Sequence, residues 1–330
     1  MTLDEIARLA GVSRTTASYV INGKADRYRI SQKTRDKVMA VVEEHNYQPD
    51  HAATSLRMGS SHSLGLVIPD LENASYARIA KLLERHARQA GFQLIISCSD
   101  DDPDTEISVA TLLLGRRIDA LIVASSLPAE HRFYRDIQEK GTPVIAIDRA
   151  MDDEHFASVI SEDLEGSFQL TSKLLDAKPE SIGLIGAVPK LVVSREREQG
   201  FRSATEKSSA DTRIVYGEHF SHEAGRRLLQ AWIDDDCVPD AILTTSFTLF
   251  EGVLDELRCH PELMNRIQLA TFGDNRLLDF LPFVVHSLPQ EFEQIAEKAL
   301  SLTLSAIKGN HQSGIDVVPR KVKWREAAKH

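Results

Sequence analysis

The chain has 330 residues, of which 42% are hydrophobic and 27% charged, the usage of an ordinary soluble globular protein. A chain of this length can form two or three domains, each with its own core. Its three cysteines form no CxxC pair and show no zinc-type spacing to histidine, which argues against a disulfide framework and a metal site. No apolar run approaches the roughly 18 residues of a membrane span, and no signal-type segment opens the chain. We expect a cytoplasmic protein with no cofactor and no metal.

Charge is distributed unevenly along the sequence. The formal net charge is −10, which by itself argues against binding to nucleic acid. Residues 1–60, however, hold 9 Lys and Arg against 7 Asp and Glu, while residues 61–330 hold 30 against 42. A modestly basic head on an acidic body fits contact with phosphates by the head only.

The first 22 residues have the pattern of two short helices joined by a tight turn. Apolar residues recur at helical spacing in the first helix: Leu3, Ile6, Ala7 and Ala10. Gly11 can supply the positive φ of a sharp turn, and Ser13 is placed to cap a second helix over Ser13–Asn22. Val20 and Ile21 should face inward. The outward face should carry Arg14, Thr15, Ser18 and Tyr19.

This layout is typical of a helix-turn-helix, whose second helix enters the DNA major groove. An ordinary αα-hairpin would explain the apolar stripe but not the outward Arg, Thr and Tyr after a capped turn. We expect Arg14, Thr15 and Tyr19 to read bases. The expected phosphate contacts are Ser13, Thr16 and Asn22.

A third helix is predicted from Ser31 to His45, with Ser31 as its N-cap and Val38, Val41 and Val42 on its apolar face. The helix-compatible stretch Asp50–Met58 follows Pro49 and has fewer than the roughly 12 residues that hold a helix in water. We therefore predict a conditional hinge helix there, or, in the plainer interpretation, a linker with one exposed leucine.

The rest of the chain alternates short apolar runs with helical patterns such as Tyr76–Ala90 and Phe133–Lys140, which predicts parallel sheets covered by helices. The strand candidates are Leu64–Ile68, Phe92–Ile96, Ala120–Ala124, Val144–Ile147, Ser158–Ile160, Ile182–Ile185, Arg213–Tyr216, Ala241–Thr244 and Leu269–Phe272. They exceed one comfortable sheet. We expect two doubly wound α/β subdomains with a cleft between them.

Ligands of open α/β sheets bind beyond the carboxyl ends of the strands. The polar residues expected there are Asp148, Arg149, Ser194, Arg197 and Asp274. A carboxylate can accept sugar hydroxyls, and an arginine can clamp a phosphate. The residues alone support only a small polyol with an anionic group. Other interpretations remain: a surface ion pair or loop cap for Asp148 and Arg149, a solvated helix face for Arg197, and a turn residue for Asp274.

Five segments carry a resemblance to the LacI family of bacterial transcriptional regulators, which covers essentially the whole chain. They are Ala10–Ser13, Val20–Lys24, Tyr47–Pro49, Ser55–Arg57 and Leu64–Pro69. Within the family, three further segments are similar to the fructose-repressor branch, namely Arg14–Tyr19, the lengthened loop Lys24–Ile30 and the loop Ile68–Asn73.

The resemblance implies a helix-turn-helix domain over 1–49, a hinge over 50–60, and an effector-binding and dimerisation domain over 61–330. In that last domain, subdomain 1 spans about 61–161 and 291–318, and subdomain 2 about 162–290 and 319–330. The chain should cross near Glu162 and return near Gln290. Ala53 and Leu56 would join the DNA contacts, with Leu56 as a wedge that kinks the duplex from the minor groove.

The resemblance also implies a repressor, and possibly an activator, of sugar and central carbon metabolism genes that an effector releases from its operator. Fructose 1-phosphate is the first choice and fructose 1,6-bisphosphate the second; another small sugar or sugar phosphate is the alternative. Many relatives carry Asn-Asp where this chain has Thr245-Ser246-Phe247, which weakens transfer of their ligand identities. A palindromic operator requires a homodimer. Residues 319–330 lack a leucine heptad, although tetramers formed in another way stay open.

Two other protein classes explain less of the sequence. A transport-associated sugar-binding protein would explain the body but not the helix-turn-helix. An enzyme would need a catalytic set, and the chain has no His-Asp-Ser order, no Gly-x-Ser-x-Gly and no metal-spaced His pair. We expect a DNA-binding regulator and no enzymatic activity.

Overall fold

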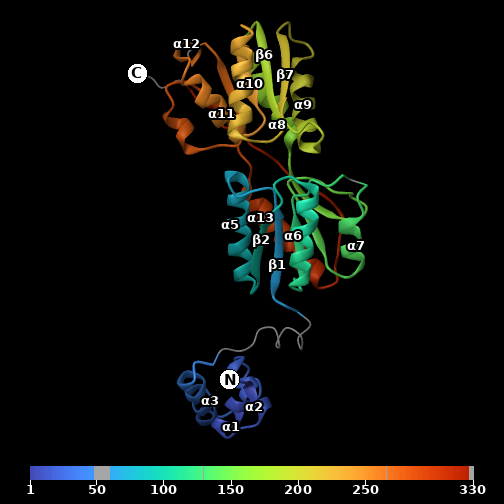
Figure 1. The fold of residues 1–330 in the computed structure, drawn as a ribbon, viewed down its shortest axis with the longest axis vertical. Helices are drawn as coiled ribbons and strands as arrows, with labels where there is room; N and C mark the ends of the chain where they lie inside the picture. Colours follow the sequence, from blue (N-terminus) through green and yellow to red (C-terminus); the bar gives the residue numbers. More distant parts are fainter. Residues whose placement is uncertain (48–59, 129, 265, 327–330) are drawn as a thin grey trace. The chain divides into compact units, whose positions relative to one another are not determined.

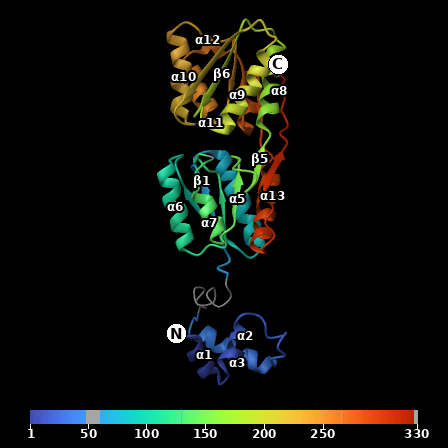
Figure 2. The ribbon, with the colours of Figure 1, turned by 90° about the vertical axis from the view of Figure 1, so that its right-hand side faces the viewer.

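The computed structural model describes residues 1–47, 60–128, 130–264 and 266–326 (Figures 1 and 2). The chain divides into two compact units, a head, Met1–Ser61, and a body, His62–His330. The predicted hinge Asp50–Met58, with Ala53 and Leu56, lies outside the described residues. Among the described helices, none is both long and apolar enough to cross a membrane.

The head is built from three helices: α1 (Leu3–Ala10), α2 (Arg14–Ile21) and α3 (Gln32–Glu44). The predicted caps are confirmed, since Ser13 accepts the backbone N–H of Thr16 and Ser31 that of Thr34. Gly11 ends α1 with a φ of 67°. The helices enclose a small apolar core of Ile6, Ala7, Ala10, Ala17, Val20, Ala25 and Val38.

The prediction of the outward face is wrong for one residue, Ser18. Ser18 is buried, and the Asn22 side-chain amide donates to its carbonyl oxygen at 2.7 Å. Arg14 and Thr15 are exposed and Tyr19 is half-buried. The outward face of α2 is therefore narrower than the sequence pattern indicates.

The body contains two sheets whose neighbouring strands all pair in parallel. The first has the order β11-β5-β4-β3-β1-β2 and the second β10-β9-β8-β6-β7. The strands are β1 (Ser63–Ile68), β2 (Gln93–Cys98), β3 (Ala120–Val123), β4 (Val144–Ile147), β5 (Ala157–Ser161), β6 (Ser181–Ala187), β7 (Asp211–Gly217), β8 (Ala241–Thr244), β9 (Gln268–Phe272), β10 (Val285–Leu288) and β11 (Gly314–Val318). The predicted two-sheet α/β class is confirmed.

Helices cover both faces of each sheet (Figures 1 and 2). The first sheet and its helices form lobe 1: α5 (Ala74–Gln89) and α13 (Phe292–Ile307) pack on one face, and α6 (Pro103–Gly115) and α7 (Phe133–Glu139) on the other. The second sheet and its helices form lobe 2: α8 (Asp163–Leu175) and α9 (Val192–Thr205) face α10 (His222–Asp234) and α11 (Phe247–Leu257) across the sheet. Lobe 2 also holds the short α12 (Pro261–Met264) and the 3-10 helix η1 (Arg276–Phe280).

The chain passes between the lobes three times. It leaves lobe 1 after β5, returns after β10, and leaves again after β11, where the backbone of Lys323 pairs with Ser287 of β10. Gln290 belongs to the second passage and Arg320 to the third. These passages bring both side chains to the junction of the lobes.

Candidate functional site

The head presents a short polar surface along α2. The Tyr19 ring stacks flat on Tyr28, with 3.7 Å between ring centroids and an interplanar angle of 1°. Tyr28 lies in the loop between α2 and α3, which Arg35 fixes by donating to the carbonyl oxygen of Ile30 at 2.9 Å and pairing with Asp26 at 2.6 Å. Sequence reasoning missed Tyr28. One ring face of Tyr19 is therefore covered before any DNA is bound.

The remaining predicted DNA contacts lie at the ends of α2. Ser13 and Thr16 share a hydrogen bond of 2.9 Å at the helix start, and Asn22 is engaged with Ser18 at the helix end. Arg14 lies 3.4 Å from the carboxylate of Asp4, with both side chains more than 60% exposed. An ion pair of this kind contributes only about 0–1 kcal/mol, so Arg14 can exchange Asp4 for another partner at little cost.

The body holds a cavity of about 430 Å³ between its lobes. Lobe 1 lines it with residues that follow β1, β2 and β4, and lobe 2 with the start of α9 and the residues that follow β7, β8 and β9. Gln290 and Arg320, from the second and third passages, complete the wall. The cavity therefore lies at the carboxyl ends of both sheets, where open α/β folds bind their ligands.

Asp148 and Arg149 form the lobe 1 wall. The Asp148 carboxylate accepts hydrogen bonds from the Tyr76 hydroxyl at 2.7 Å and from the Gln290 amide at 3.0 Å. Burial would raise the pKa of Asp148, but the guanidinium groups of Arg197 and Arg149 outweigh it and hold that pKa below its usual range. Asp148 is therefore an ionised acceptor beside the cavity.

Arg149 is almost fully buried and pairs with Asp101, with 2.6 Å between Nη1 and Oδ1. Burial works against the charged guanidinium, but Tyr76 and Asp101 hold the pKa of Arg149 above its usual range. The cation therefore persists in a partly closed cavity, where it can attract an anionic ligand.

A second charged group forms the lobe 2 wall. Arg197 donates to Asp163 at 2.8 Å and to the carbonyl oxygen of Thr245 at 2.8 Å. Arg320 pairs with the other oxygen of Asp163 at 2.6 Å. The Phe272 ring has both cations near it, with the guanidinium carbons 4.6 Å and 5.3 Å from its centroid. Asp163 therefore holds two arginines together.

Glycine at position 200 makes this grouping possible. A Cβ atom there would lie 2.2 Å from the carbonyl oxygen of Leu164, so α9 can approach α8 closely only without a side chain. The approach brings Arg197 of α9 against Asp163, the first residue of α8. The spacing of Arg197 and Gly200 along α9 thus has a packing reason.

Each of the three arginines that line the cavity is paired with an aspartate. Arg149 pairs with Asp101, and Arg197 and Arg320 both pair with Asp163. Among the described residues, buried polar atoms without a hydrogen-bond partner include Arg149 Nε, Arg320 Nε and Thr245 Oγ1, all from residues that line the cavity. Buried donors are normally satisfied, so these atoms indicate a place that water or a ligand completes.

Comparison with known proteins decides the family. Residues 2–50 match the model "Bacterial regulatory proteins, lacI family", and residues 61–254 match "Periplasmic binding proteins and sugar binding domain of LacI family". The chain belongs to the LacI family. It is a DNA-binding transcription regulator, as the N-terminal motif predicted, and the family resemblance is confirmed.

Named relatives match nearly the whole chain. The fructose operon regulatory protein of Vibrio cholerae is 59% identical over 98% of this chain and 100% of its own length. The catabolite repressor/activator of Escherichia coli is 49% identical over 93% of this chain and 92% of its own. The resemblance to the fructose-repressor branch thus rests on both regions of the molecule.

Solved structures match as well. The Cra transcriptional dual regulator from Pseudomonas putida, in complex with fructose 1-phosphate, is 50% identical, covers 80% of this chain and 99% of its own, and has a TM-score of 0.79. A lac repressor dimer bound to operator covers 99% of this chain and 98% of its own, with a TM-score of 0.86. At 21% identity the lac repressor is evidence for the fold alone.

The structure brings three of the five predicted ligand residues of this LacI-family body together: Asp148, Arg149 and Arg197 line the cavity. Ser194 and Asp274 do not. The Ser194 hydroxyl donates to the carbonyl oxygen of Ala187 at 2.7 Å, and Asp274 pairs with Arg325 and accepts a hydrogen bond from Ser287. Their position after a strand was correct, but other protein groups occupy their polar atoms.

Sequence reasoning missed Tyr76, Asp101, Gln290 and Arg320, which line the cavity, and Asp163, which pairs with two of its arginines. Among these, Asp101 had a signal, because it stands in the acidic run Asp100–Asp102 shortly after a strand. Arg197, in contrast, is buried while Arg195 of the same charged run is exposed. The solvated-face interpretation therefore holds for Arg195 and fails for Arg197.

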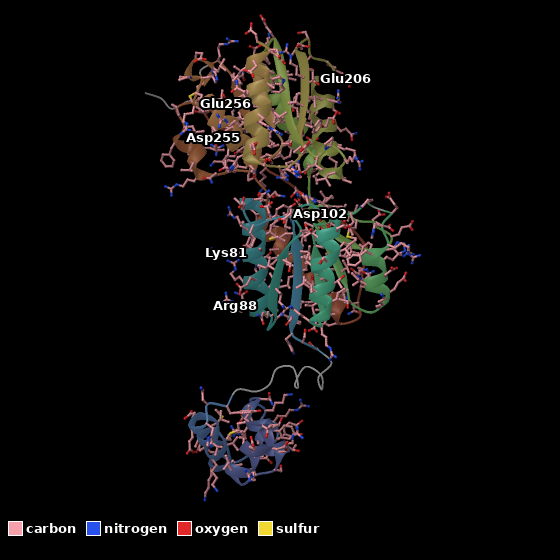
Figure 3. All side chains as sticks on the ribbon, viewed as in Figure 1. Lys81, Arg88, Asp102, Glu206, Asp255 and Glu256 are labelled. Carbon is pink, nitrogen blue, oxygen red and sulfur yellow. The ribbon has the colours of Figure 1, made fainter. Side chains whose placement is uncertain are left out.

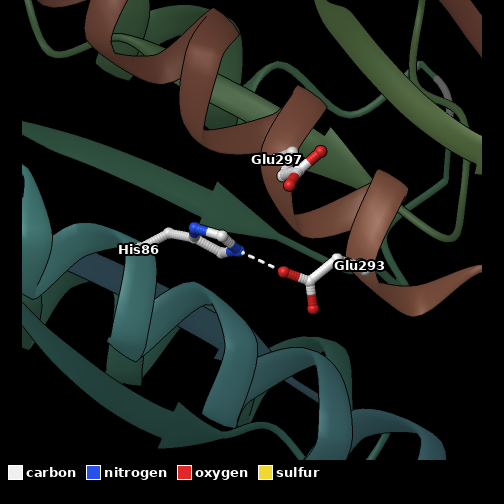
Figure 4. Close-up of side chains that lie close together, drawn as sticks. All are labelled: His86, Glu293 and Glu297. Atoms are coloured by element: carbon white, nitrogen blue, oxygen red, sulfur yellow. Dashed lines mark hydrogen bonds and ion pairs between the residues drawn. The ribbon is translucent and has the colours of Figure 1, made fainter.

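Two clusters in lobe 1 have metal-ligand residue types. His86 lies 2.9 Å from Glu293, with Glu297 one helical turn further along α13 (Figure 4). Arg85 also pairs with Glu293, so its carboxylate is already neutralised. The second cluster, Asp152, Glu154 and His155, is a half-buried loop held by its own hydrogen bonds. Neither cluster points to a resident ion.

Proposed function

We propose that this regulator releases its operator when fructose 1-phosphate occupies the cavity of the body, with fructose 1,6-bisphosphate as the second candidate. The observation that carries the proposal is the set of three arginines with buried side chains that line one cavity. A dianionic phosphate needs cations in such a place, and bidentate guanidinium groups suit its geometry. The names of the Vibrio cholerae relative and of the Pseudomonas putida complex support the sugar identity.

Polar groups beside the arginines suit a sugar. Asp148 accepts from Tyr76 and Gln290, and sugar hydroxyls can join or replace these donors. Five further acidic residues line the same cavity: Asp70, Glu72, Asp100, Asp101 and Glu223. They would repel a second phosphate, which favours the monophosphate over the bisphosphate. Another small sugar phosphate remains the alternative ligand.

On the DNA side, we assign base reading to Arg14, Thr15 and Tyr19. Arginine at the start of a recognition helix can donate to guanine O6 and N7. The exposure of Arg14 and its weak pair with Asp4 support this role. The phosphate contacts assigned to α2 are Ser13, Thr16 and Asn22.

The predicted hinge is tested by a separate experiment. We propose that Asp50–Met58 becomes helical when two copies meet on DNA, that Ala53 belongs to that contact and that Leu56 enters the central base step from the minor groove. Leu56→Ala should reduce operator bending and weaken specific binding, measured by gel mobility of circularly permuted fragments. Unchanged bending and affinity would contradict the wedge.

Coupling between the sites follows from differential affinity. The ligand would favour one arrangement of the two lobes and shift a homodimer away from its operator-bound form. A coupling free energy of about 1–3 kcal/mol is enough for a 5- to 150-fold loss of operator affinity. The proposal places this protein in the cytoplasm, beside its DNA, and gives it no enzymatic activity. Dimers satisfy the scheme and tetramers are compatible with it.

Arg197 is the sharpest test. Arg197→Ala should bind operator but fail to release it, because the variant lacks one of three cations for the phosphate. The matched control is Arg195→Ala, which removes an exposed arginine from the same helix. Calorimetric titration with fructose 1-phosphate, fructose 1,6-bisphosphate, fructose and inorganic phosphate ranks the ligands. Release of Arg197→Ala at wild-type fructose 1-phosphate concentrations would show that the site lies elsewhere.

A further inference from the structure

We infer that Asp101 is an internal competitor for the anionic group of the ligand: its carboxylate occupies Arg149 in the empty cavity and gives way when a phosphate arrives. The inference rests on the proposed function, since it concerns the same cavity. It adds a residue that sets the threshold for anionic ligands and excludes neutral ones. Sequence reasoning assigned Asp101 no role.

The loop that carries Asp101 is held in a costly conformation. Asp100 and Asp101 both have positive φ, 54° and 55°, a region that non-glycine residues rarely adopt in succession. Asp102 anchors the following turn as the N-cap of α6, and Figure 3 shows it at the edge of lobe 1 that faces lobe 2. The Asp100 N–H donates to the carbonyl oxygen of Pro69 at 2.8 Å. This strain persists at a point where it aims a carboxylate at a cavity cation.

The ion pair of Asp101 and Arg149 is easier for a ligand to displace than the pairs of Asp163. Among the described residues, the Asp101 side chain bonds only to Arg149, and 18% of it is exposed. Asp163, in contrast, is 3% exposed and serves two arginines at once, so displacing it would strand two buried charges. A freed Asp101 can turn to water, because its loop lines the cavity mouth with Asp100.

The exchange discriminates by charge. A phosphate can replace a carboxylate on a guanidinium, since it offers stronger and bidentate acceptors. A neutral sugar hydroxyl cannot displace Asp101, because Arg149 would then exchange a charge-assisted hydrogen bond for a weaker one to a neutral partner. Competition from Asp101 therefore lowers the affinity for every anion. In the empty cavity the Asp101 carboxylate neutralises the charge of Arg149.

The test compares Asp101→Asn with the wild-type full-length protein by calorimetry. Asparagine tolerates positive φ well, so the loop conformation is retained. Removing the competing charge should tighten binding of fructose 1-phosphate by about tenfold or more, the scale of one charge-assisted hydrogen bond. Inorganic phosphate should gain affinity in the same direction, and fructose should not. Asp104→Asn, which removes an exposed carboxylate from the first turn of α6, is the matched control and should stay within about twofold.

The two proposals fail in different ways. If neither the wild type nor Asp101→Asn binds fructose 1-phosphate, the proposed effector is wrong. The affinities of the two proteins for inorganic phosphate still test whether Asp101 competes with anions. If Asp101→Asn binds inorganic phosphate and fructose 1-phosphate no better than wild type, or more weakly, Asp101 positions Arg149 for the ligand and the competition model is overturned. Thermal unfolding of each variant verifies that the fold is intact.

Discussion

The recognition surface of the head and the cavity of the body hold their arginines in opposite ways, the first exposed to solvent and the second buried in ion pairs. On α2, Arg14 stands in solvent with one weak partner, Asp4. In the cavity, Arg197 and Arg320 are buried and held by a shared carboxylate, Asp163. The head keeps its cation available and contributes little stability through it. The body has tied its cations into the packing of two lobes.

This difference teaches where stability and function can be separated. An exposed side chain can be removed at the cost of binding alone, because water replaces its contacts. A buried ion cluster that loses its shared carboxylate leaves its cations uncompensated. Three substitutions test the contrast, in order of expected effect.

Asp163→Ala should give the largest effect. It would leave Arg197 and Arg320 as adjacent buried cations, and breaking a buried ion pair costs about 3–5 kcal/mol. Urea unfolding of the full-length protein, followed by the fluorescence of the buried Trp232 of lobe 2, measures the loss. Glu165→Ala, two residues along α8 and exposed, is the control. A loss below about 1 kcal/mol would mean that the cluster is held by the surrounding packing and not by its carboxylate.

Arg14→Ala should change DNA discrimination and leave stability untouched. Loss of a guanine contact costs about 1–3 kcal/mol, which should appear on operator DNA and hardly at all on random duplex. Fluorescence anisotropy with both duplexes at one salt concentration measures the difference. Arg8→Ala, which removes an exposed arginine from α1, controls for the loss of charge. Equal weakening on both duplexes would make Arg14 a phosphate contact.

Tyr28→Ala should give the smallest effect. Aromatic stacking contributes about 0.5–1.5 kcal/mol, so freeing the Tyr19 ring should weaken operator binding several-fold. Tyr28→Phe keeps the stack and should bind as the wild type does. If Tyr28→Phe binds operator as weakly as Tyr28→Ala, the Tyr28 hydroxyl and not the stacked ring supports operator binding.

Much of the fold could be predicted from the sequence, because its signals are local. The four apolar residues of Val144–Ile147 became β4 with the predicted bounds, since both faces of a central parallel strand are buried. Strands β10 and β11 were not predicted. His286 and Ser287 interrupt the apolar run of β10, and β11 is an edge strand in which Ile315 and Val317 stay half-exposed. Ser18 was predicted to face outward because it is polar, but it is buried.

The cavity could be predicted only in part, for the opposite reason. Asp148 and Arg149 follow a strand directly, so their place at the sheet edge is a local property. The closest cationic partner of Asp274 is Arg325, which lies 51 residues away, and no sequence pattern around Asp274 predicts that pair. Arg320 likewise reaches the cavity only because the chain returns to lobe 2 after β11. Pairings between distant segments are what the sequence pattern leaves undetermined.

The third passage has a consequence for genetics. A nonsense mutation at Pro319 would spare the head and every strand that the described residues form, yet it would delete both Arg320 and Arg325. Asp163 and Asp274 would each lose a cationic partner in the shortened product. Selection for alleles that still bind operator but ignore the effector should therefore include stop codons between Pro319 and Arg325.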